Sequence, residues 1–159
     1  MTWTASAVVS EHQRAQVRAV LQTMGQEMYV NDENALDMAT AVSGTGPTYV
    51  FLLMEALVDA AVHLGFSRRQ AQQLVVQTVL GSAIYAQQSD LHLAQLRNQV
   101  TSPGGTSAEA IYQLEKGGLR TVLSKAIWAA YKKTRLLGEQ LRQPPQSPLR
   151  INGEDSWSQ

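Results

Sequence analysis

The stretch "SGTGPTYVFLLMEALVDAAVHLG", residues 43–65, decides the fold class. Four small residues lead to Pro47, and proline suits the first turn of a helix because its missing N–H would be unpaired there. Apolar residues then recur at helical spacing as far as Gly65, a residue type that commonly ends helices. We therefore predict a break in the chain at residues 43–47, followed by a long helix.

The patterns on either side of this stretch are also helical. Ser67 and Gln70 have the spacing of a capping box, and the helix that they open is expected to reach about Gln88. Because every strong period after residue 31 is helical, we predict an all-α main domain. Further helices are expected over residues 31–42 (a weak signal), 91–100 with Asp90 as the cap, 107–116 and 119–141.

The first thirty residues form a separate pattern. Ser10 and Gln13 match a second capping box, a helix follows as far as Gly25, and Glu27 to Val30 have the character of a short strand. This piece is too small to bury its own apolar face. We expect three segments: residues 1–30, a helical domain over 31–142, and a Pro-rich disordered tail over 143–159.

Composition narrows the class of protein. Of the 159 residues 44% are hydrophobic and only 16% charged, which favours a large buried interface. Thirteen basic and thirteen acidic residues cancel, so nucleic acid is not an expected partner. Cysteine is absent, which excludes disulfides and thiolate chemistry. The start lacks a signal-peptide pattern, and the apolar run Tyr49–Met54 is far shorter than a membrane span, so we expect a soluble cytoplasmic protein.

The stretch "TSPGGTSAEAIYQLE", residues 101–115, is a candidate anion site. Glycines let a bound group approach the backbone closely, and a helix N-terminus offers unpaired N–H groups with a partial positive charge. Hydroxyls add further donors, so the site suits a carboxylate or a phosphate. However, Thr106 and Glu109 also match a capping box that needs no ligand, and from spacing alone this capped turn is the favoured interpretation.

Other kinds of site find little support. His12, His63 and His92 are far apart without metal-ligand spacing, so no metal is expected. We identify no catalytic residue. The turn at residues 43–47 is not a dinucleotide fingerprint, because it opens no βαβ unit and lacks the later glycine.

Taken together, two long stretches resemble one known family. They are "DMATAVSGTGPTYVFLLMEALVDAAVHLGFSRRQA" (37–71) and "GSAIYAQQSDLHLAQLRNQVTSPGGTSAEAIYQLEKGGLRTVLSKA" (81–126). They are similar to the C-terminal half of pyrroline-5-carboxylate reductase, which makes proline by hydride transfer from NAD(P)H to the C=N bond of a cyclic imine carboxylate. The resemblance covers roughly Glu33 to Leu141. It implies an interlocked homodimer of helical domains, preceded by the last helix and strand of a Rossmann domain.

The resemblance also implies site residues. The family's imine-carboxylate loop falls on Ser102, Gly104, Gly105, Thr106 and Ser107, and Asp90 lies near its substrate pocket. A cofactor-proximal segment falls on Ser43, Thr45, Gly46 and Pro47. This chain departs from the usual pattern at several positions, with serine at 107 for threonine, aspartate at 90 for glutamate, leucine at 93 for proline and threonine at 45 for serine.

The expected function follows from what the chain contains. Without a glycine-rich fingerprint it is expected to hold no cofactor alone, whereas the complete family enzyme uses NAD(P)H. The leading hypothesis is a dimerisation and carboxylate-binding domain that is inactive in isolation, as a homodimer or a larger homo-oligomer. The alternatives are the helical half of a split enzyme with a separate Rossmann-domain partner, a non-catalytic assembly or proline-sensing module, and a fragment of a longer reductase.

Overall fold

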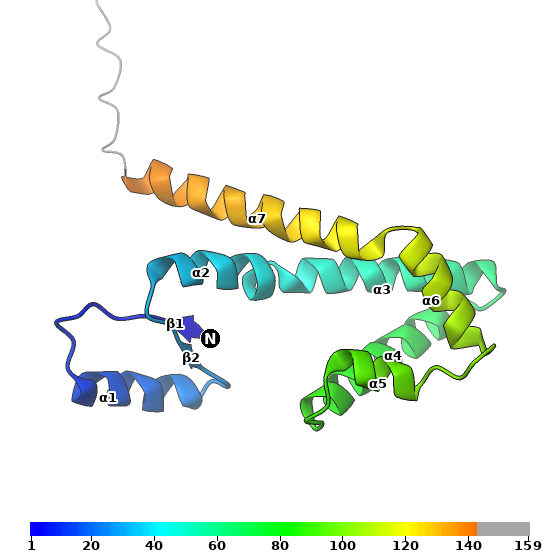
Figure 1. The fold of residues 1–159 in the computed structure, drawn as a ribbon, viewed down its shortest axis with the longest axis horizontal. Coiled ribbons are helices and arrows are strands. Elements are labelled where there is room, and N and C mark those ends of the chain that lie inside the picture. Colours follow the sequence, from blue (N-terminus) through cyan, green and yellow to red (C-terminus); the bar gives the residue numbers. More distant parts are fainter. Residues whose placement is uncertain (143–159) are drawn as a thin grey trace, which may run out of the picture.

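A helical rod is the longest feature of the computed structural model, which describes residues 1–142 (Figure 1). It consists of α2 (Glu33–Ala39), a π-helical turn η1 (Thr40–Gly44) and α3 (Gly46–His63). Pro47 lies in the first turn of α3, as expected. The predicted break at residues 43–47 is shorter than expected, because the Thr45 N–H donates to the Thr40 carbonyl at 2.8 Å and the helix widens, so that Thr45 alone separates η1 from α3. The tail predicted over 143–159 lies outside the described residues.

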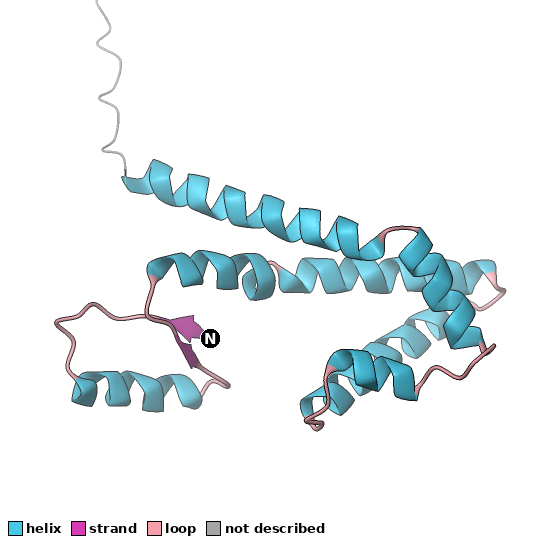
Figure 2. Cartoon of the chain, in the orientation of Figure 1, coloured by secondary structure: helices cyan, strands magenta, loops and turns pink. Residues whose placement is uncertain are grey.

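Helix α4 (Arg68–Gln87) returns along α3 and forms the main apolar contact with it (Figure 2). The predicted capping box is confirmed, since Ser67 accepts from the Gln70 N–H and Gln70 reaches back to the Ser67 backbone. Gly65 has a φ of 109° just after α3, which explains a glycine at this turn. The buried cluster between the two helices is Val58, Ala71 and Val75, flanked by Met54, Ala61, Val62 and Val79.

Three more helices complete the helical domain: α5 (Leu93–Gln99), α6 (Thr106–Lys116) and α7 (Leu119–Arg142). Helix α7 runs beside α2 and η1. Tyr131 Oη donates to Asn34 Oδ1 at 2.6 Å and Arg142 bonds Glu33 at 3.1 Å, so hydrogen bonds from two turns of α7 hold α2. The expectation of an all-α main domain is confirmed.

The N-terminal residues form a small β–α–β unit. Strands β1 (Thr2–Trp3) and β2 (Met28–Tyr29) are parallel, and α1 (Glu11–Gln22) connects them. The Ser10 capping box and the strand near residue 28 are confirmed, whereas β1 was not predicted because two residues carry no period. The Trp3 indole N–H donates to Glu27 at 2.6 Å, and its ring meets Tyr29 edge-on at 4.8 Å.

The helices leave much apolar surface uncovered in a single chain. Phe51 and Leu52 are 67% and 66% exposed, and no charged residue occurs between Arg69 and Asp90. The run Glu33–His63 is long and apolar enough to cross a membrane by length and composition, a test that apolar helices of soluble proteins also pass. Among residues 1–142 the buried apolar side chains are Ala41, Val58, Ala71, Val75 and Leu96. So small a core indicates that a second chain covers α3 and α4.

Replacing Phe51 by alanine tests whether a second chain covers the apolar faces of α3 and α4. The side chain is largely exposed in one chain, so its loss leaves the fold of that chain intact. In a two-fold interface two copies each lose about 1.5–3 kcal/mol of apolar burial, which raises the dimer dissociation constant at least about 100-fold. Sedimentation equilibrium measures the change. Val8→Ala, at a residue 91% exposed outside the helical domain, is the matched control. Equal dissociation constants for Phe51→Ala and the unmodified chain would contradict the assignment.

Candidate functional site

The turn before α6 is built by local hydrogen bonds that leave its outer face open. Thr101 closes α5, because its hydroxyl donates to the Arg97 carbonyl at 2.7 Å. The chain then turns back through Gly104, whose φ of 70° favours glycine, and the Gly105 N–H donates to the Ser102 carbonyl at 3.1 Å. Helix α6 therefore begins immediately after a tight turn whose middle is exposed.

Gly105 and Ser102 are in close contact at the start of α6. A Cβ added to Gly105 would lie 2.5 Å from Ser102 Oγ and 3.2 Å from the Ser102 carbonyl oxygen, so only glycine leaves the hydroxyl where it is. The hydroxyl thus lies against the backbone at the N-terminus of the helix. Within residues 1–142 the side chains of Ser102, Thr106 and Ser107 and the N–H groups of Thr106 and Ser107 form no hydrogen bond. These groups are neutral donors without partners within the described residues.

The capping box predicted for Thr106 and Glu109 does not form. Gly105 occupies the cap position and has no side chain to cap with, while Thr106 is already the first residue of the helix. Glu109 Oε1 accepts from Gln113 Nε2 at 2.8 Å, one turn further along α6. The carboxylate is therefore held away from the start of the helix and does not cap it. Both features leave the first N–H groups of α6 available to an anion.

Asp90 lies apart from this turn. It is exposed in the connection between α4 and α5, and the loop follows the other end of α5, about 10 Å of helix away. The expectation that Asp90 caps α5 is wrong, because His92 is the cap and its Nδ1 accepts from the Ala94 N–H at 3.1 Å. No hydrogen bond or ion pair within residues 1–142 connects Asp90 to the turn.

The second candidate segment, residues 43–47, lies in and beside the π-helical turn of the rod. Ser43 and Gly44 belong to η1, Thr45 follows it, and Gly46 and Pro47 begin α3. The Thr45 hydroxyl donates to the Thr40 carbonyl at 3.0 Å, and Tyr49 Oη donates to the Ala41 carbonyl at 3.0 Å. The hydroxyl of Tyr49 was not identified from sequence, because this residue lies in an apolar run and looks like part of a core.

The two candidate segments do not meet within one chain. Figure 1 shows the turn before α6 at the end of the molecule formed by α4 and α5, whereas η1 lies further along the rod toward α2. The β1–α1–β2 unit lies at the opposite end from the turn. A small ligand that contacts both segments would therefore need them from different chains.

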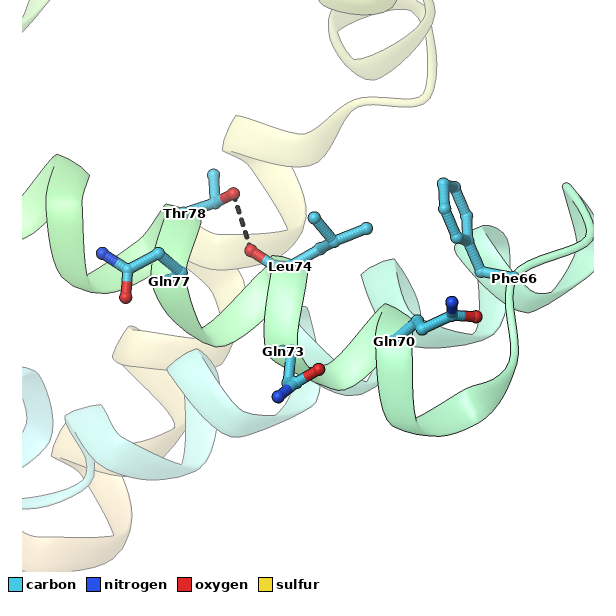
Figure 3. Close-up of a pocket in the computed structure, with 6 residues that line it drawn as sticks. All are labelled: Phe66, Gln70, Gln73, Leu74, Gln77 and Thr78. Carbon is cyan, nitrogen blue, oxygen red and sulfur yellow. Dashed lines mark hydrogen bonds between the residues drawn. The ribbon is translucent and has the colours of Figure 1, made fainter.

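An open hollow on α4 offers different chemistry. It has a volume of about 460 Å³, and Figure 3 shows glutamine amides along it, with the Thr78 hydroxyl bonded to the Leu74 carbonyl at 2.8 Å. None of its side chains is charged or titratable, so it has no group for acid–base chemistry or for pairing with an ion. Its lining is Phe66, Gln70, Gln73, Leu74, Gln77 and Thr78. Within residues 1–142 no cluster of His, Asp and Glu could hold a metal ion.

Comparison with known proteins identifies the helical domain. Residues 33–137 match the family described as pyrroline-5-carboxylate reductase dimerisation. Pyrroline-5-carboxylate reductase of Pseudomonas aeruginosa is 42% identical over 139 residues, which cover 87% of this chain and 51% of that protein. The reductase of Pisum sativum is 46% identical over 106 residues, covering 67% and 39%. The chain thus spans about half the length of the first two curated relatives that it matches.

Solved structures agree with this match. A pyrroline-5-carboxylate reductase from Coxiella burnetii has a TM-score of 0.82 and 39% identity, covering 86% of this chain and 50% of that one. The Plasmodium falciparum pyrroline carboxylate reductase, determined with NADP bound, has a TM-score of 0.77 and 34% identity, covering 86% and 53%. A dimerisation domain also accounts for the uncovered apolar faces of α3 and α4. The chain belongs to the pyrroline-5-carboxylate reductase family, and its helical domain is the family's dimerisation domain.

Proposed function

We propose that this chain supplies the dimerisation and substrate-carboxylate-binding half of a pyrroline-5-carboxylate reductase. The observation that carries the proposal is the close approach of Gly105 and Ser102, which leaves the Ser102 hydroxyl beside Gly105 at the unpaired N–H groups of α6. A carboxylate is planar and accepts several hydrogen bonds at once, so these donors match it. Ser102, Thr106 and Ser107 donate, and Gly104 and Gly105 allow the close approach.

In the proposed reaction these donors orient the substrate. The cyclic imine carries its carboxylate next to the C=N bond, so a carboxylate fixed at α6 fixes the face of the imine that receives the hydride. A reduced nicotinamide would supply the hydride, and the residues of this chain that would border it are Ser43, Thr45, Gly46 and Pro47. The Plasmodium falciparum relative was determined with NADP bound, which supports this assignment of cofactor.

The proposed active site forms between chains of an interlocked homodimer. Within one chain the turn before α6 and the β1–α1–β2 unit lie at opposite ends, which supports a site where the loop of one chain faces the nucleotide-binding part of its partner. Asp90, which lies at the other end of α5 from the turn, would border this site only from a distance of about 10 Å of helix.

The small N-terminal sheet favours a nucleotide-binding partner domain. The parallel pair β1–β2 has a helix crossover, yet each strand has only one neighbour within residues 1–142. Parallel sheets are normally larger and covered on both faces, so two strands of two residues need further strands beside them. We infer that a Rossmann domain, in the same polypeptide or a separate one, packs here. Residues 1–142 alone are therefore inactive in hydride transfer.

A fusion protein tests the proposed function. The nucleotide-binding half of the Pseudomonas aeruginosa relative, joined in front of this chain, is expected to reduce pyrroline-5-carboxylate with NADPH, whereas the chain alone is not. In the fusion Ser102→Ala raises KM for the imine about tenfold or more, the worth of one hydrogen bond to a charged group, and leaves KM for NADPH unchanged.

The matched control is Ser124→Ala, which removes an exposed hydroxyl from α7. A dimeric fusion that binds NADPH but fails to turn over the imine would contradict the proposal. So would equal imine KM values for Ser102→Ala and Ser124→Ala.

The Gly105 contact gives a test that needs no turnover. A methyl group at Gly105 displaces the Ser102 hydroxyl, so Gly105→Ala is expected to weaken binding of proline to this chain about 10- to 100-fold. Isothermal titration calorimetry measures the affinity. Gly138→Ala makes the same chemical change in α7, where an added Cβ has no heavy atom within 4 Å, and is expected to leave affinity unchanged. Equal affinities of the two variants would rule out the proposed donor geometry.

A further inference from the structure

We propose that Tyr49 and Thr45 are positioning residues, whose hydroxyls hold the cofactor-proximal segment in its π-helical register. The link to the cofactor rests on the proposed function, whereas the register itself is a property of this chain. The importance of the π-helical turn lies in the direction that it gives to the backbone of Ser43 and Gly44.

The register differs from an α-helix by one identifiable hydrogen bond. In an α-helix the Thr45 N–H would donate to the Ala41 carbonyl, four residues back. Here it donates to the Thr40 carbonyl at 2.8 Å, and the Thr45 hydroxyl donates to the same oxygen at 3.0 Å. The side chain of Thr45 thus reinforces the longer backbone bond.

The shift deprives the Ala41 carbonyl of its α-helical donor. Ala41 is 1% exposed, so water cannot replace that donor, and a buried unpaired carbonyl is costly. The Tyr49 hydroxyl donates to this oxygen at 3.0 Å from the first turns of α3. The Tyr49 hydroxyl therefore supplies the hydrogen bond that the Ala41 carbonyl would receive from the Thr45 N–H in an α-helix.

Surrounding residues favour the same register. A proline ring clashes with the carbonyl four residues earlier, and for Pro47 this is Ser43, within η1. The widened turn also packs against α7, where Ile127, Trp128 and Tyr131 face Met38, Ala41 and Val42. These features favour a departure from α-helical geometry at residues 40–44. The hydroxyls of Thr45 and Tyr49 determine that the departure is a π-helical turn.

Amide hydrogen exchange and NMR chemical shifts of the full chain test the proposal. Tyr49→Phe keeps the ring and removes one hydroxyl, so exchange of the Thr45 amide is expected to accelerate about tenfold, with chemical-shift changes concentrated in residues 40–46. Tyr112→Phe is the matched control, because the Tyr112 hydroxyl forms no hydrogen bond within residues 1–142. Equal exchange rates in these two variants would overturn the role of Tyr49.

Thr45 provides a rescue experiment. Thr45→Val keeps the shape of the side chain and removes the hydroxyl, so it is expected to accelerate exchange of the amide at residue 45. Thr45→Ser restores the hydroxyl and is expected to restore slow exchange and the original chemical shifts. A lower melting temperature in Thr45→Val with unchanged shifts at residues 40–46 would show a general packing role and overturn the proposal. Proline binding at the turn before α6, measured separately by calorimetry, reports on the proposed function and is independent of these results.

Discussion

The π-helical turn at Thr40–Gly44 is the constraint on which the rest of the domain depends. It joins α2 and α3 into one rod, and α7 packs on α2 and η1 while α4 packs on α3. Each residue of an α-helix advances about 100°, so one extra residue in a turn rotates the faces on its two sides relative to each other. The buried residue Ala41 can thus lie near α7 while Val58 faces α4. One displaced backbone bond thereby sets two helix contacts.

Sequence predicted the elements whose signals are local. The two capping boxes were correctly found because both partners of each box lie three residues apart, at Ser10 with Gln13 and at Ser67 with Gln70. The break at residues 43–47 was predicted to be longer than it is, because small residues before a proline look the same in an open turn and in a widened helix. What separates the two is the bond from the Tyr49 hydroxyl to the Ala41 carbonyl, at a residue that the surrounding apolar run makes look like core, and the packing of α7, which comes from far along the sequence.

The candidate site shows the same division. Glycines and hydroxyls before a helix pointed to a turn with donors, but the same residues also fitted a cap made by Thr106 and Glu109. The choice depended on where the helix begins: with Gly105 at the cap, Glu109 bonds along the helix and the donors stay unpaired. Sequence patterns could not predict that this turn lies far from Ser43–Pro47, because that distance follows from the length of the rod formed by α2, η1 and α3. They also could not show that a second chain, which the apolar faces require, would bring such segments together.

The chemistry of the turn bears on how a reductase would use it. No basic residue occurs between Arg97 and Lys116, so this segment itself offers the proposed carboxylate neutral donors and a helix N-terminus rather than an ion pair. The imine substrate and its product proline carry the same carboxylate, so the binding energy of that group is nearly equal in both, and the group acts on the chemical step through orientation alone. A buried ion pair would tighten both complexes and slow product release. Neutral donors orient the substrate for hydride transfer and bind the carboxylate with moderate affinity. Because the reaction does not change the carboxylate, moderate affinity also lets the product leave.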